Sequence, residues 1–331
     1  VGSEMCIRDR YRQRLNRSND SSGNIDNLPT SIDIAGIGVK LGKGFSIFAG
    51  KQCTAYGGIE FDLNPIEIYE YSDMIENMSN FMTGLNIGYD INAHQQLNLQ
   101  ILDSRNGSFN KTYGVETEDG EQPAIESGKL PLVYTLNWNG NFNDIFKTRW
   151  SASIMNEAKD KNLYYFAFGN ELNLNKFNMF LDFMYSKEGI DRKGIMTGIT
   201  DSMEGHNAFD AGYFSMVTKL NYRFLPKWNA FVKGMYETAS LTKQQGDLEK
   251  GKYRTAWGYF AGVEFYPMDT NLHFFLTYVG RSYDFTARAK ALGQENYSTN
   301  RVSVGFIYQL PMFWVSGFSR LASFLLSAVS Y

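Results

Sequence analysis

Long stretches of the chain alternate apolar and polar side chains one by one. The clearest is "YFSMVTKLNYRFLPKWNAFVKG", which covers residues 213–234. Phe214 and Leu220 belong to its apolar set, whereas Lys219 and Arg223 belong to the other set. Successive side chains of a strand point to opposite faces, so the stretch predicts a β-hairpin with two unlike faces. Because unpaired lysine and arginine are costly in a dry core, we expect the polar face to meet water and the apolar face to meet lipid.

The same alternation recurs along the chain and predicts about fourteen strands, most of them about ten residues long. They lie near residues 11–16, 31–40, 44–52, 81–89, 96–102, 131–139, 146–155, 164–172, 177–185, 213–224, 228–236, 253–265, 272–278 and 302–310. A tilted strand needs about this length to cross a bilayer. The mean hydropathy is −0.34, and the strand-rich part has no clean apolar run long enough for a membrane helix. A membrane protein of this composition would have to be a β-barrel, since half of its strand residues face water.

Short and long connections alternate between these strands. The short ones are "LGKG", "DINAHQ", "NGNFND", "LNK", "LPK" and "PMDTN". The long ones are 17–30, 53–79, 103–130, 187–211, 239–252 and 284–297, with a short exception near 157–161. Aromatic residues make up 15% of the chain and concentrate near strand ends, as in the girdles at membrane interfaces. We therefore predict an all-β, transmembrane antiparallel β-barrel in a bacterial outer membrane.

The stretch "AGKQCTAYGGIEFDLNPIEIYEYSDMIENMSNFMTGLNIGYD" (49–90) resembles the phosphate-selective porin O and P family, in its Bacteroidetes-type branch. The segments "YRQRLN" (11–16), "RNGSF" (105–109) and "SVGFIYQLPMF" (303–313) fit the same family, so the resemblance covers roughly residues 11–313. It implies a sixteen-stranded porin, which would leave an aqueous channel rather than a packed core. It also implies a homotrimer that passes small anions, with phosphate or anions in general as the solute.

The two ends of the chain do not fit a barrel. Residues 1–10, "VGSEMCIRDR", resemble translated sequencing adapter, and we expect the barrel to occupy 11–313 with two strands missing upstream. Pro311 would end ladder pairing, and the apolar run "ASFLLSAV" then loses the period of two. We expect residues 314–331 to be an extraneous tail; an added amphipathic or membrane helix is the alternative.

Strand parity assigns charged side chains to the lumen, where rings of charge set the selectivity of a channel. The pore-lining candidates are Arg12, Arg14, Lys147, Arg149, Lys219, Arg223, Lys233, Arg254, Arg281 and Arg301. Arginine suits phosphate because its planar fork binds two oxygens at once. Fewer acids share this parity, namely Asp90, Glu171, Asp182, Glu237 and Glu264. The alternative is that charges near strand ends are rim residues in solvent.

The connection 53–79 is acidic and has no lysine or arginine beyond its start. Its constriction-loop candidates are Glu60, Asp62, Glu67, Glu70, Asp73 and Glu76. Asn64-Pro65 predicts a turn into a short helix. The family resemblance implies that this loop folds into the pore, where its acids would face a basic wall and create a transverse field. The alternatives are a solvated acidic loop and one that binds divalent ions beside lipopolysaccharide.

No pattern in the sequence predicts a cofactor, a metal site or nucleic-acid binding. The three histidines, His94, His206 and His273, lack metal-ligand spacing, and the net charge is −3. We therefore expect a passive diffusion channel for small anionic solutes, not an enzyme, with outer-membrane lipid and lipopolysaccharide as its surroundings. The alternatives are a soluble or surface β-protein that binds glycans and a barrel enzyme that uses His273.

Overall fold

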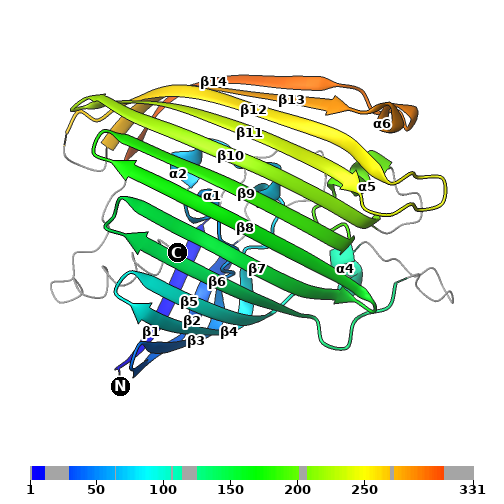
Figure 1. Cartoon of the computed structure of the whole chain (residues 1–331), viewed down its shortest axis with the longest axis horizontal. Helices are drawn as coiled ribbons and strands as arrows, with labels where there is room; N and C mark the ends of the chain where they lie inside the picture. The colour runs from blue at the N-terminus through cyan, green and yellow to red at the C-terminus, as the bar shows by residue number, and fades with distance from the viewer. Residues whose placement is uncertain are drawn as a thin grey trace.

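The chain folds into one strongly curved antiparallel sheet. The computed structural model describes residues 2–11, 30–63, 65–105, 107–113, 125–200, 207–268 and 272–308. Fourteen strands follow one another in chain order, each paired with the next, and β1 and β14 form the two edges of the sheet (Figure 1). The prediction of an all-β transmembrane barrel fold is confirmed by this arrangement of long, tilted strands.

The strands are long enough to cross a membrane at a tilt. Their bounds are β1 Gly2–Tyr11, β2 Thr30–Gly42, β3 Phe45–Cys53, β4 Phe81–Asn92, β5 Gln95–Asp103, β6 Leu132–Phe142, β7 Phe146–Ala158, β8 Lys161–Leu174, β9 Phe177–Ile190, β10 Phe209–Leu225, β11 Trp228–Leu241, β12 Gly251–Phe265, β13 Leu272–Phe285 and β14 Tyr297–Tyr308.

The first strand differs from the expectation. We expected it over residues 11–16, yet β1 occupies Gly2–Tyr11 and pairs with β2 from Gly2 opposite Lys40 to Tyr11 opposite Thr30. The adapter-like residues are therefore part of the sheet, because the edge of β2 offers unpaired backbone groups to whichever segment precedes it. The remainder of the expected strand, and the tail 314–331, lie outside the described residues.

Side chains alternate between the two faces of the curved sheet as predicted. On β10, Tyr213, Val217 and Lys219 point inward and are at most 5% exposed. Their neighbours Phe214 and Leu220 point outward, where only other outward side chains cover them. The outer face is a continuous apolar surface suited to lipid.

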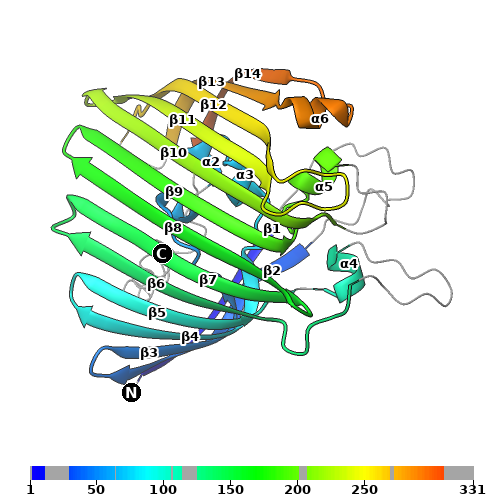
Figure 2. The ribbon, with the colours of Figure 1, turned by 45° about the vertical axis from the view of Figure 1, so that its right-hand side comes forward.

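The two rims of the barrel differ, as the alternation of loop lengths predicts. Helices α4 (Phe109–Tyr113), α5 (Ile195–Thr200) and α6 (Ala287–Ala291) lie at the rim of the long loops, and the tight turns lie at the other rim except the one between β7 and β8 (Figures 1 and 2). In outer-membrane barrels the rim of short turns is periplasmic. Within the described part of the chain, no helix is both long and apolar enough to span a bilayer.

Three further short helices lie inside the curve of the sheet rather than at a rim. They are α1 (Ile59–Asp62), α2 (Pro65–Ile68) and α3 (Asp73–Glu76), and all belong to the connection between β3 and β4 (Figures 1 and 2). The turn predicted at Asn64-Pro65 leads into α2, whose first residue is the proline, as the fixed φ of proline favours.

Candidate permeation pathway

The connection 53–79, here called the inner loop, lies inside the curve of the sheet against its inner wall (Figures 1 and 2). Helix α1 packs against β8 and β9, and α3 packs against β10. Ile68 and Met74 are at most 1% exposed although they belong to a loop. The inner loop is thus a folded element on the inner wall and not a solvated loop outside the barrel.

The acids of the inner loop contact the cations that parity assigns to the wall. The closest approaches are Lys233 to Glu60 at 2.6 Å, Arg149 to Asp62 at 2.9 Å, Arg281 to Asp73 at 2.9 Å, and Arg281 and Arg301 to Glu70 at 3.3 Å each. Arg254 also pairs with Asp73. These members of the two sets, which we expected to create a transverse field in the pore, are therefore in direct contact as ion pairs.

Arg281 is the centre of the largest of these networks. Its guanidinium donates to Glu237 at 2.8 Å and to the carbonyl of Tyr71 at 3.4 Å, in addition to its loop carboxylates. Glu237 on β11 also accepts from the hydroxyl of Ser215 at 2.7 Å and from the backbone N–H of Met74 at 3.3 Å. Such buried charges persist because each has a charged or hydrogen-bonded partner.

Asp62 is the acid of the inner loop whose proton affinity departs most clearly from that in water. Burial raises the pKa of Asp62 to about 6, while the neighbouring Arg149 acts to lower it. Burial disfavours the charged form of a carboxyl group, which explains the direction of the change. Protonation of Asp62 would leave Arg149 with less compensating charge.

The periplasmic end of the inner loop is fixed by an aromatic contact. Tyr69 stacks on Phe231 with 5.0 Å between ring centroids, and its hydroxyl donates to Glu264 at 2.7 Å. Tyr69 has a φ of 64°, a left-handed conformation that is uncommon for a bulky residue. Lys219 lies beside this contact, with its Nζ 2.6 Å from the carbonyl oxygen of Glu67 and 4.8 Å from the centre of the Phe231 ring.

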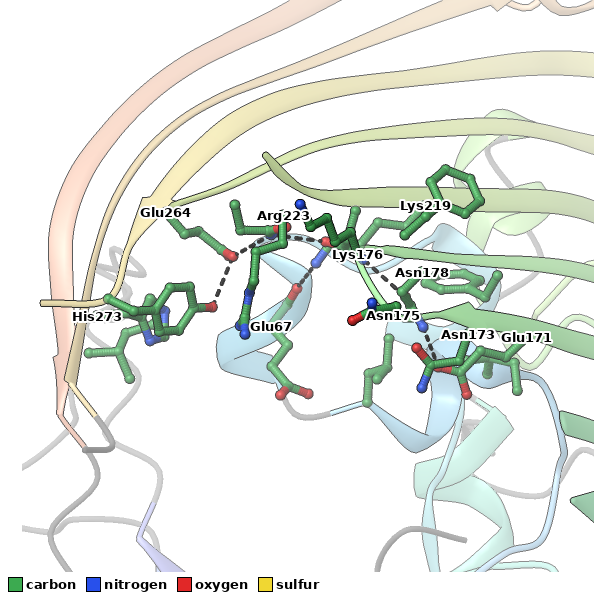
Figure 3. Close-up of a pocket in the computed structure, with 18 residues that line it drawn as sticks. Glu67, Glu171, Asn173, Asn175, Lys176, Asn178, Lys219, Arg223, Glu264 and His273 are labelled. Atoms are coloured by element: carbon green, nitrogen blue, oxygen red, sulfur yellow. Dashed lines mark hydrogen bonds between the residues drawn. The ribbon is translucent and has the colours of Figure 1, made fainter. Parts of the chain in front are cut away.

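A cavity of about 550 Å³ lies between the inner loop and the rim of short turns (Figure 3). Its lining includes the basic residues Lys176, Lys219, Arg223 and His273, the acids Glu67, Glu171 and Glu264, and the amides Asn173, Asn175, Asn178, Asn221 and Asn229. We call it the mouth cavity. The guanidinium of Arg223 stands 5.5 Å from the centre of the Tyr266 ring, which holds its charge at the edge of the cavity.

Two of the acids that line the mouth cavity, Glu264 and Glu171, accept hydrogen bonds from neighbouring side chains. Glu264 accepts from Tyr69, from Asn229 at 2.8 Å and from Tyr266 at 3.0 Å. Glu171 accepts from Asn178 at 2.6 Å and lies 3.8 Å from Lys147. Within the described ranges, no ion pair joins Lys176, Lys219 or Arg223 to a carboxylate. The charges of these three lining cations are therefore not cancelled by direct ion pairs.

The remaining candidates differ in position. Glu67 and Glu76 have exposed side chains, and Glu67 is part of the lining of the mouth cavity. Arg12, Arg14 and His206 fall outside the described residues. Sequence reasoning missed Lys176 and the asparagines around it, because Asn175 and Lys176 form a tight turn and the alternation of strands does not assign turn residues to a face.

Comparison with known proteins points to one family and one fold. The profile of the phosphate-selective porin O and P family matches residues 9–310. No protein with a curated description matches the chain in sequence.

Two solved structures are similar in fold. The outer-membrane channel DcaP of Acinetobacter baumannii has a TM-score of 0.56 at 11% identity, with 86% of this chain and 76% of that chain covered. An anion-selective porin from Comamonas acidovorans has a TM-score of 0.50 at 9% identity, with 84% and 78% covered.

Proposed function

The chain belongs to the phosphate-selective porin O and P family and forms a channel in the bacterial outer membrane, and we propose that small anions cross it by diffusion through the mouth cavity. The family and the fold point to a channel rather than to an enzyme. The observation that carries the proposal is the unequal pairing of charges along the wall. Arg149, Lys233 and Arg281 are paired with carboxylates, whereas the cations of the mouth cavity have no described ion pair.

The proposal divides the pore-lining candidates into two groups with different roles. The first group holds the inner loop against the wall and consists of Arg149, Lys233, Arg254, Arg281 and Arg301. Because these cations are paired with carboxylates, they attract a passing anion only weakly. Arg223 and Lys176 remain at the aqueous edge of the mouth cavity, where they attract anions and repel cations. Arg223 can also offer two donors at once to an oxyanion.

Reversal potentials in a planar bilayer test the proposal. The full chain in a potassium chloride gradient should give the sign of an anion-preferring channel, and Arg223→Glu should move the potential toward cation preference. Lys227→Glu is the matched control: Lys227 is exposed in the next turn, donates to the carbonyl of Pro267, and lies outside the lining of the mouth cavity. Equal potentials for wild type and Arg223→Glu would contradict the proposal.

We include phosphate among the solutes because the family is named for it. Phosphate would compete with chloride at Arg223 and slow the passage of chloride, since the bidentate contact of arginine with phosphate lasts longer than a point-charge contact. Added phosphate should therefore reduce the chloride current of the wild-type channel, and this reduction should be weaker in Arg223→Lys. A chloride current that phosphate leaves unchanged would restrict the proposal to anions in general.

We also propose that the channel is a homotrimer embedded among outer-membrane lipid and lipopolysaccharide. Its apolar outer face, with side chains such as Leu136 and Trp257 that are 53% and 47% exposed, supports burial against lipid or another copy. Chemical cross-linking in native membranes should give a ladder that ends at three copies. A ladder that stops at one copy would contradict the trimer and leave the channel proposal unaffected.

A further inference from the structure

We infer that Asp182 is the positioning residue that sets the place of the inner loop, and through it the width of the channel. The inference rests on the proposed function, a diffusion channel whose interior holds the inner loop. Asp182 lies on β9 with its side chain fully buried, and it forms no ion pair with the predicted wall cations within the described residues. Its partners are instead two backbone groups of the inner loop.

Both oxygens of the Asp182 carboxyl group accept hydrogen bonds from the start of α1. Oδ1 accepts from the N–H of Ile59 at 2.9 Å, and Oδ2 accepts from the N–H of Glu60 at 2.7 Å. The first N–H groups of a helix have no partner within the helix. Here Asp182, a wall residue more than 120 positions away, supplies the acceptor for these N–H groups. The start of α1 therefore has its hydrogen bonds satisfied only when the loop lies at this place on the wall.

Glycines on both sides let the inner loop come close enough for these bonds. Gly57 and Gly58 have φ values of 69° and 88°, in the left-handed region that glycine enters without strain. Gly169 is directly opposite Asp182 on the neighbouring strand β8. A Cβ atom at Gly169 would stand 2.7 Å from the Cα of Gly58 and 2.7 Å from the backbone nitrogen of Ile59, so any side chain there would push the loop off the wall.

The same short segment is bonded to a third strand. The N–H of Gly58 donates to the carbonyl of Arg149 on β7 at 3.0 Å, and the hydroxyl of Ser151 donates to the carbonyl of Tyr56. Strands β7, β8 and β9 thus form a seat for residues 56–60. By fixing α1 in this seat, Asp182 also positions Glu60 and Asp62, which belong to α1 and pair with Lys233 and Arg149 on the wall.

Two substitutions disturb the seat in different ways, and each has a matched control. Asp182→Asn keeps the shape but turns an amide N–H₂ toward a backbone N–H, and Gly169→Ala places a methyl group against backbone. Asp284→Asn makes the same chemical change at an exposed residue of β13 that accepts from Asn296. Gly234→Ala adds the same methyl group where the nearest atom is 3.7 Å away.

Two measurements on the full-length protein follow the loop. The first is single-channel conductance in a planar bilayer, which should rise, with more current noise, in Asp182→Asn and Gly169→Ala. The second is the rate at which a water-soluble maleimide labels Ile59→Cys in a background with Cys6→Ser and Cys53→Ser. Ile59 is 5% exposed in its seat, and we expect both substitutions to speed its labelling about tenfold or more, since local release exposes it.

The outcomes separate this inference from the proposed function. Wild-type conductance and labelling rate in a folded Asp182→Asn, with both controls also unchanged, would overturn the role of Asp182 whatever the ion selectivity. If Asp182→Asn fails to show the heat-dependent gel migration of a folded barrel, Gly169→Ala decides alone. A wild-type channel that prefers cations would contradict the proposed solutes and leave the prediction for the seat intact.

Discussion

Lys233 and Glu60 form an ion pair whose side chains are 1% and 0% exposed. A buried pair of this kind gives little net stability compared with an apolar pair, but removing one partner leaves an uncompensated charge. Glu60 has further donors in the N–H and hydroxyl of Ser72, at 3.1 and 2.5 Å. The carboxylate therefore stays in place only while the inner loop and the wall remain together.

We expect Lys233→Met to lower the free energy of unfolding by about 3–5 kcal/mol, as for other broken buried pairs. The double variant Lys233→Met/Glu60→Gln should recover most of the loss, because the glutamine stays hydrogen-bonded to Ser72 without a charge. Urea unfolding in lipid vesicles, followed by tryptophan fluorescence, measures both variants. A double variant at least as unstable as Lys233→Met alone would show that the uncompensated charge of Glu60 is not the cause.

The raised pKa of Asp62 makes selectivity depend on pH. The pKa is about 6 in the seated loop against 3.8 for a carboxyl group in water. Because the pKa is higher in the seated loop, protonation of Asp62 stabilises the seated state. This stabilisation is complete below pH 3.8 and is lost as the pH rises through about 6. Acidification through pH 6 should thus keep the loop seated, remove one negative charge beside Arg149 and strengthen anion preference.

Reversal potentials on either side of pH 6 measure this effect. The shift toward anions should be present in the wild type and in Asp284→Asn, and smaller in Asp62→Asn, which cannot take up the proton. An equal shift in all three proteins would assign the titration to another group.

Strand β10 shows most directly how one element meets two solvents. Leu220 pairs across the sheet with Val232 on one side and Met179 on the other, so it lies within an apolar row on the outer face. Asn221, the next residue, lines the mouth cavity. Leu220 and Asn221 are consecutive residues, yet their side chains lie on opposite faces of the barrel wall.

Leu220→Arg should therefore impair membrane insertion by about 2–4 kcal/mol if it lies near the middle of the bilayer. Asn221→Arg should insert normally, since its side chain enters an aqueous cavity. The folded fraction in vesicles as a function of urea, read from gel migration without heating, gives both values. Equal damage by both changes would contradict the assignment of the two faces.

The strands and their two faces were predictable because the alternation of apolar and polar side chains can be read from consecutive residues. The alternation fixes the face of Lys219 or Arg281 but not its height along the barrel axis, which depends on the stagger of all strands. Lys219 and Arg223 consequently share a face, yet Lys219 is buried beside Tyr69 and Arg223 is exposed. The pairing of Arg281 with Glu70 joins residues 211 positions apart, and no local pattern encodes such a contact.

The channel as a whole should lose selectivity as the salt concentration rises. Its selective charges lie in water at the mouth cavity, and the screening length falls from about 30 Å at 0.01 M to about 3 Å at 1 M. The permeability ratio of anions to cations should therefore fall toward one across this range. A ratio that stays constant would mean that buried, unscreened charges of the inner loop set the selectivity instead.

The contacts of the inner loop also bear on the order in which the barrel assembles. It belongs to the connection after β3, but its partners Lys233, Arg254 and Arg281 belong to β11, β12 and β13. Contacts between such distant residues form late, because the intervening chain must first be fixed. Until those strands join the sheet, Glu60, Glu70 and Asp73 lack their cations, whereas Asp62 already has Arg149 on β7. We therefore expect the inner loop to complete its contacts with the wall late in the assembly of the barrel.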